Sequence, residues 1–254
     1  MYHFKSYRKV QVFLFLLFLI ALPINAHAID ECTITDRECV LEELISNASS
    51  IDNVAWKDQT YREIAKTLAF EKNFEKALVV IDLIETPDTK AMSIRGVGMA
   101  LAAYGEDAES LNKKFAKLRV KADSITNHPP SHGIALTYVA MAQAFAGDNE
   151  GAWKTTASME NAALKHKAYG ETAEIQAEKG DFKSAKISID KIESLSFRNK
   201  AYETVSKILS DKGLYEDSYL AARSITNAYK KGQAIQYLLD QQQPRERLSN
   251  EKDK

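Results

Sequence analysis

The sequence predicts an all-α fold, an α-solenoid of stacked helix-turn-helix repeats of about 33 residues. Helix-breaking glycines recur at a fixed interval in helix-friendly stretches, and small and large apolar residues keep constant positions relative to them. An interior glycine costs a helix about 1 kcal/mol against alanine, so a regular interval indicates turns between short helices. One helix pair cannot bury its apolar face alone, so we expect the pairs to stack.

The first 28 residues have the character of a secretory signal. Three basic residues precede the apolar run VQVFLFLLFLIAL at positions 10–22, and small residues surround position 28. We therefore predict a signal peptide over residues 1–28 that is cleaved after Ala28. The alternative is an uncleaved membrane anchor, but a spanning helix needs about 20 apolar residues. This run has 13.

Composition and charge limit the classes of partner. The 254 residues are 45% apolar and 27% charged, which suits one large globular or elongated domain. Signal cleavage removes Lys5, Arg8 and Lys9 and no acidic residue, which leaves 31 basic and 35 acidic side chains and a formal charge of −4. Such a chain does not attract nucleic acid. We expect an exported protein, periplasmic or secreted, with no membrane span after cleavage.

Residues 29–59 are predicted to hold a capping helix that covers the open end of the stack. The stretch TDRE at 35–38 has the form of a capping box, and apolar residues follow it at helical spacing. Cys32 and Cys39 lie seven residues apart, and an exported chain meets an oxidising compartment. We predict a disulfide between them, with two free thiols as the alternative.

The repeat domain is predicted over residues 60–243. We define a marker residue twelve places before each turn glycine, and extend the frame by 33 residues at both ends. The markers are Thr60, Ser93, Ala135, Ala168, Ala201 and Ala234. The next residue is large and apolar in each unit: Tyr61, Ile94, Leu136, Tyr169, Tyr202 and Ile235. The fifth residue after the marker is small in five units: Ala65, Gly98, Ala140, Ala173 and Ser206. Small residues on a helix face let two helix backbones approach closely.

The turns and the unit lengths vary in two places. The first unit has Lys72-Asn73 where later units have glycine, and asparagine also tolerates the left-handed conformation that ends helices. The second unit is nine residues longer, and we place the surplus in 111–133 as a longer second helix, ended by Asn127 and the prolines that follow. Residues 244–254 are polar and are predicted to be disordered.

The small residues, the large residue beside them and the turn glycine resemble the tetratricopeptide repeat over residues 60 to about 240. The units have 33 residues where that family has about 34, and tyrosine stands at Tyr61, Tyr169 and Tyr202 where the family usually has tryptophan. HEAT-like and armadillo-like arrays therefore stay open as alternatives. The resemblance implies a right-handed superhelix whose first helices line a concave groove that binds peptides or protein surfaces.

Helix geometry selects the side chains that would face this groove. Positions two, six, nine and ten beyond the marker share a face opposite the second helix. The candidate groove residues are Arg62, Phe70, Arg95, Met99, Met141, Phe145, Glu174 and Glu203. The same face holds Glu178, Lys207 and Asp211, with Ala69, Ala102 and Ala144 leaving room. The N-terminal half is apolar and basic and the C-terminal half is mainly acidic. The alternative is that the methionines and phenylalanines are ordinary core between repeats.

No motif predicts catalysis or a cofactor. His128 and His132 in HPPSH have a suggestive spacing, but we expect the prolines to prevent the turn that would bring the imidazoles together, so no metal site is predicted. The leading hypothesis is an exported scaffold that binds a protein or peptide partner, in the assembly of an envelope or secretion complex. The alternative is a secreted effector or carbohydrate-handling enzyme on a helical toroid. The oligomeric state is unknown.

The signal peptide has a direct test. We expect the mature protein to begin at Ile29, because the small residues that end the signal suit cleavage after Ala28. Intact-mass spectrometry of the protein isolated from its host measures this start. A mass that retains residues 1–28 would instead show a membrane tether.

Overall fold

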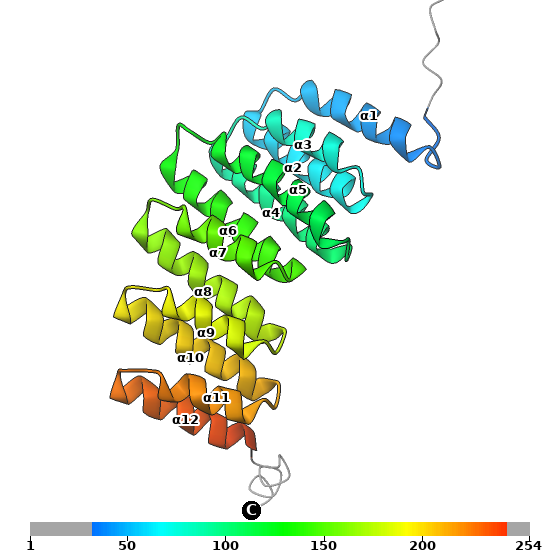
Figure 1. Ribbon diagram of the computed structural model, residues 1–254. Helices are drawn as coiled ribbons and strands as arrows, with labels where there is room; N and C mark the ends of the chain where they lie inside the picture. The colour runs from blue at the N-terminus through cyan, green and yellow to red at the C-terminus, as the bar shows by residue number, and fades with distance from the viewer. Residues whose placement is uncertain (1–31, 243–254) are drawn as a thin grey trace, which may run out of the picture.

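The computed structural model describes residues 32–242, which form twelve α-helices (Figure 1). The predicted signal peptide (1–28) and polar tail (244–254) lie outside the described residues. The helices are α1 (Arg37–Ser49), α2 (Val54–Phe70), α3 (Phe74–Asp82), α4 (Pro87–Ala103), α5 (Ala108–Asp123), α6 (Pro129–Ala146), α7 (Asn149–Ala157), α8 (Ala162–Glu178), α9 (Phe182–Asp190), α10 (Leu195–Asp211), α11 (Tyr215–Arg223) and α12 (Ala228–Gln242). Within residues 32–242, no helix is long and apolar enough to cross a membrane.

The helices pack as sequential pairs. Each even-numbered helix from α2 to α10 contacts the odd-numbered helix that follows it and also the next even-numbered helix. The even-numbered helices begin at residues 54, 87, 129, 162, 195 and 228, so each begins six residues before its marker. The array runs from α1 at one end to α12 at the other (Figure 1). This confirms an all-α fold with the sequential packing of a helical repeat.

The residues that define the repeat are buried between helices. The large residue after the marker is at most 5% exposed in the first five units, and the small residue at the fifth position is buried in all five. Gly98 shows why the small residue is needed. A Cβ atom at this position would lie 2.9 Å from the Cβ of Ala142 and 3.2 Å from Leu118. The backbones of α4 and α6 therefore approach too closely for a larger side chain.

The turns within pairs follow the predicted pattern with one correction. Gly105, Gly147, Gly180 and Gly213 all have positive φ. In the first unit it is Lys72, with φ of 64°, that takes the left-handed conformation. Asn73 is instead the N-cap residue of α3. The position in the repeat therefore decides that the backbone is left-handed there, even where the residue is a lysine, for which this conformation is unfavourable.

The longer second unit is also corrected in detail. Helix α5 has 16 residues where α3 has nine, as expected for the added residues. However, α5 ends at Asp123, before Asn127, and Pro129 begins the next helix, α6. Proline suits the first turn of a helix because the backbone N–H it lacks would have no partner there.

Helix α1 covers the N-terminal end. Cys32 and Cys39 form a disulfide, with their Cα atoms 5.5 Å apart, just before and within the first turn of α1. The N-cap is Asp36, whose carboxylate accepts a hydrogen bond from the Cys39 N–H at 3.1 Å. The helix packs on α2, and Arg37 Nε donates to the Glu71 carboxylate at 2.7 Å. The disulfide fastens residue 32 to the first turn of α1, and the Arg37–Glu71 contact ties that turn to the end of α2.

The apolar core has three clusters. One runs from Leu41 to Ala168, another from Tyr169 to Ala234, and a small one of Ala140, Ala144, Ala152 and Ile175 lies on α6, α7 and α8. The same three helices, together with α9, also carry buried polar side chains. The Thr155 hydroxyl donates to Gln143 Oε1 at 2.7 Å, and the Ser188 hydroxyl donates to Gln176 Oε1 at 2.7 Å. Hydrogen bonds of this kind satisfy the buried amides, whereas the buried hydroxyls of Thr156 and Thr172 have no partner among the described residues.

A buried carboxylate joins the first two repeats. Asp58 on α2 is 0% exposed and accepts hydrogen bonds from the backbone N–H groups of Glu85 and Thr86, at 3.1 and 2.7 Å. The Thr86 hydroxyl also donates to it at 2.7 Å. Asn199 on α10 occupies the same repeat position and accepts from the Thr226 N–H at 2.8 Å. Each side chain fixes the loop that enters the next first helix.

Replacement of Asp58 should therefore loosen the stack. We expect Asp58→Ala to lower the free energy of unfolding by about 2 kcal/mol, because it leaves buried backbone N–H groups unsatisfied. The measurement is chemical denaturation followed by circular dichroism. Asp52→Ala, at an exposed position, is the matched control and should leave the midpoint nearly unchanged. Equal midpoints for the two variants would contradict the role of Asp58.

Candidate partner-binding groove

The first helices of four neighbouring repeats line a hollow of about 530 Å³, which we call the central hollow. Its apolar lining consists of Met99, Tyr138, Met141, Phe145, Ile175 and Ile208. Its charged lining consists of Arg95, Glu171, Glu174 and Glu178. These side chains come from α4, α6, α8 and α10, which are consecutive in the array. A ligand in this hollow would therefore lie across the helices.

The central hollow contains five of the eight predicted groove residues. They are Arg95, Met99, Met141, Phe145 and Glu174. Arg62 lines a neighbouring hollow of about 320 Å³ that also includes Arg95 and Met99. Glu203 lines a third hollow, at the C-terminal end. Phe70 is 51% exposed and lines none of these three.

The predicted apolar groove residues are not fully buried. Phe70 and Phe145 are 51% and 36% exposed, and Met99 and Met141 are half-buried. The ninth position beyond the marker was wrongly assigned to the groove. Ala69 and Ala144 are 1% and 0% exposed, because this position turns toward the second helix of the same pair.

Two further positions of the repeat reach the hollow and were missed. Tyr138 and Glu171 stand three residues beyond the marker, and Ile175 and Ile208 stand seven beyond it. Positions three and seven are four residues apart, so they lie on one helix face next to positions six and ten. This spacing was the available signal. The face of the first helices that lines the hollow is therefore rotated away from position nine, toward positions three and seven.

Arg95 presents a guanidinium group on the α4 side of the hollow. Its Cζ atom lies 5.4 Å from the ring centroid of Tyr138, and the Tyr138 hydroxyl donates to the Met92 sulfur at 3.4 Å. The Arg95 side chain is exposed and makes no ion pair or hydrogen bond with any residue between 32 and 242. Stacking on the ring orients the cation and leaves its N–H groups available to a ligand.

Three glutamates on one face of α8 form the opposite side. Glu171 lies 3.5 Å from Lys167 Nζ, and Glu178 lies 3.8 Å from Lys212 Nζ. Glu174 stands between them and has no ion-pair or hydrogen-bond partner among the described residues.

The pKa of the Glu174 carboxyl reflects this setting. Burial raises it above its ordinary value, and the charges of Glu171 and Glu178 raise it further, against the opposing effect of Lys200 on α10. The carboxylate is thus partly removed from water without an ion pair, and the charge of Lys200 offsets only part of this effect.

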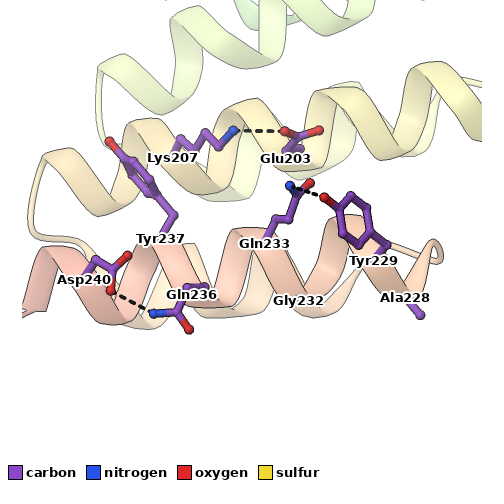
Figure 2. Close-up of a pocket in the computed structure, with 9 residues that line it drawn as sticks. All are labelled: Glu203, Lys207, Ala228, Tyr229, Gly232, Gln233, Gln236, Tyr237 and Asp240. Carbon is purple, nitrogen blue, oxygen red and sulfur yellow. Dashed lines mark hydrogen bonds and ion pairs between the residues drawn. The ribbon is translucent and has the colours of Figure 1, made fainter.

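A larger hollow, about 780 Å³, lies at the C-terminal end between α10 and α12 (Figure 2). Its polar side chains are already paired with one another. Lys207 Nζ donates to Glu203 at 2.9 Å, Gln233 to the Tyr229 hydroxyl at 3.0 Å, and Gln236 to Asp240 at 2.8 Å. Figure 2 shows these pairs within the hollow. We therefore place the candidate site in the central hollow, where charged groups lack partners.

The two histidines of HPPSH contact different neighbours, and the prolines, contrary to the prediction, do not prevent a helical turn. The backbone N–H of His132 donates to the His128 carbonyl at 3.1 Å, so a helical turn does form over the prolines. The imidazole of His128 lies 2.6 Å from the Ser131 hydroxyl, and that of His132 lies 3.1 Å from Asp123. In the part of the chain that is described, no three His, Cys, Asp or Glu side chains gather to hold a metal ion.

The described residues thus define an all-α protein of twelve helices packed in sequential pairs, with a charged and apolar hollow across its first helices. No family model matches the sequence, and no curated protein matches it. Among solved structures, the chain is similar to the crystal structure of Ton1535 from Thermococcus onnurineus NA1. The identity is 13%, the match covers 82% of this chain and 86% of that one, and the TM-score is 0.24. At that TM-score the likeness carries no argument about function.

The setting of Glu174 predicts a stability that depends on pH. A carboxyl whose pKa is raised by folding binds more protons in the folded state, so stability falls as pH rises through the ordinary carboxyl pKa of about 4.3 and above it. We expect Glu174→Gln to have a higher Tm than the wild type at pH 7. The difference should shrink toward pH 4, where the wild-type carboxyl is protonated.

Thermal unfolding followed by circular dichroism between pH 4 and pH 7 measures this difference. Glu43→Gln, at an exposed position on α1, is the control and should track the wild type. A lower Tm for Glu174→Gln at pH 7 would show that the carboxylate is stabilised by its surroundings.

Proposed function

We propose that this protein is an exported scaffold of the tetratricopeptide type, which binds a protein partner along the face formed by its first helices. It acts in the periplasm or outside the cell, in the assembly of an envelope or secretion complex. In this proposal the helix pairs form a right-handed superhelix, and the central hollow lies on its concave side.

One observation carries the proposal. Five residues selected from the sequence as groove residues line one hollow, in which Arg95 and Glu174 lack partners among the described residues. An unpaired carboxylate that is partly removed from water, beside exposed apolar side chains, is costly to keep in a folded protein and is typical of binding surfaces. Methionine supports this function because its flexible thioether adapts to irregular apolar partners.

Export rests on separate support. The predicted signal over 1–28 directs the chain out of the cytoplasm, and the disulfide between Cys32 and Cys39 suits an oxidising compartment. Envelope or secretion-complex assembly is the corresponding role for an exported scaffold.

The alternative, an enzyme on a helical toroid, is not favoured by a specific observation. Such an enzyme needs carboxylates that converge in a closed bowl. The described helices form an open array with its two ends apart (Figure 1), and the three glutamates of the central hollow come from one helix, α8.

Site-specific photocrosslinking in the native host tests the scaffold function. A photoreactive residue in place of Phe145 should capture a discrete partner protein. The same residue in place of Ile187 on α9 should not capture it. The two positions are matched, since Phe145 is 36% and Ile187 is 37% exposed.

A second experiment tests whether the crosslink at Phe145 depends on the charges of the groove. Arg62→Glu combined with Arg95→Glu should lower the yield of that crosslink about tenfold, the ratio that corresponds to roughly 1.4 kcal/mol. Lys154→Glu combined with Lys183→Glu, at exposed positions on α7 and α9, is the control. If the groove variant captures the same partner in the same yield, the groove assignment is wrong.

A further inference from the structure

We propose that the central hollow binds an extended protein segment in which a lysine or arginine stands beside a large apolar residue. This inference rests on the proposed function and deepens it, because it specifies the chemistry of the segment. The apolar residue sits among the methionines and isoleucines of the hollow, and the cation lies against the glutamates of α8.

The shape of the hollow favours an extended chain. Its lining comes from α4, α6, α8 and α10, so it crosses three helix-to-helix spacings. At about 9 Å for each spacing, the path is roughly 27 Å long. An extended chain rises about 3.3 Å for each residue, so about eight residues cover this path. A compact small molecule would reach only part of it.

The charged residues of the hollow predict which way the bound segment lies and which residues it contains. Glu171, Glu174 and Glu178 stand on one face of α8, with spacings of three and four residues. Lys167 and Lys212 form ion pairs with Glu171 and Glu178, whereas Glu174 in the middle has no ion pair and feels only the charge of Lys200, which lies beyond ion-pair distance. A cation from the partner would give Glu174 the missing ion pair and relieve the repulsion among the three carboxylates. Arg95 lies on α4, two first helices away from α8. Its guanidinium would repel that cation and donate hydrogen bonds to a carboxylate of the segment.

The apolar part of the lining adjoins this acidic face. Ile175 follows Glu174 on α8, Met141 and Phe145 come from α6, and Ile208 comes from α10. A large apolar side chain can therefore be buried next to the cation. Neighbouring apolar and acidic surfaces explain why we expect both residue types together, and not a run of lysines alone.

The test is a selection of random twelve-residue peptides on the full mature chain. We expect enriched peptides to carry a lysine or arginine next to a large apolar residue. The variant with Glu171→Gln, Glu174→Gln and Glu178→Gln should lose the basic residues from its enriched peptides and keep the apolar ones. The best wild-type peptide, measured by fluorescence anisotropy at low salt, should bind this variant about tenfold more weakly.

A matched variant controls for the loss of three charges. Glu43→Gln, Glu150→Gln and Glu216→Gln remove exposed carboxylates from α1, α7 and α11 and should leave the selection unchanged. Circular dichroism confirms that both triple variants fold.

The outcomes separate this inference from the proposed function. Enriched peptides without basic residues, or a basic preference that survives in the central-hollow variant, would overturn the inference and leave the scaffold function standing. A failure to enrich any peptide, together with no crosslink at Phe145, would overturn both.

Discussion

The structure depends on the close approach of successive first helices. No pair in this array has a core of its own, because each pair covers the apolar face of the next. The distance between backbones is set by the small residue at one position of each first helix. At Gly98 even a methyl group would collide with Ala142. The large residue beside the marker then fills the space that remains, so the same two positions control packing along the whole array.

The same constraint explains what could be predicted from the sequence. Close packing restricts the residue type at a position in every repeat, so the frame of 33 residues and the burial at the marker were visible without a structure. The groove was predicted less well, because its side chains meet solvent and are less restricted. Position ten lines the central hollow at Phe145, whereas position nine faces the interior at Ala144. Tyr138 was missed because position three was not counted as part of the groove face, although its spacing relative to positions six and ten indicated this, and its contact with Arg95 of the preceding first helix cannot be read from one helix.

The hollows differ in whether their charges are already paired. At the C-terminal end, each polar side chain that lines the larger hollow and could attract a ligand is bonded to a neighbour, as Glu203 is to Lys207. In the central hollow, a stacked guanidinium and a half-buried carboxylate face a shared apolar surface. Volume alone would favour the hollow at the C-terminal end over the central hollow. The free energy that a partner can gain by supplying missing counter-charges is the better criterion.

The central hollow spans more than one apolar cluster of the array. Ile175 and Met141 belong to or pack on the small cluster of α6, α7 and α8, and Ile208 packs on the cluster that runs from Tyr169 to Ala234. An occupant that contacts both clusters adds its binding free energy to the contacts between them. Partner binding would then raise the free energy needed to separate neighbouring repeats in the middle of the array.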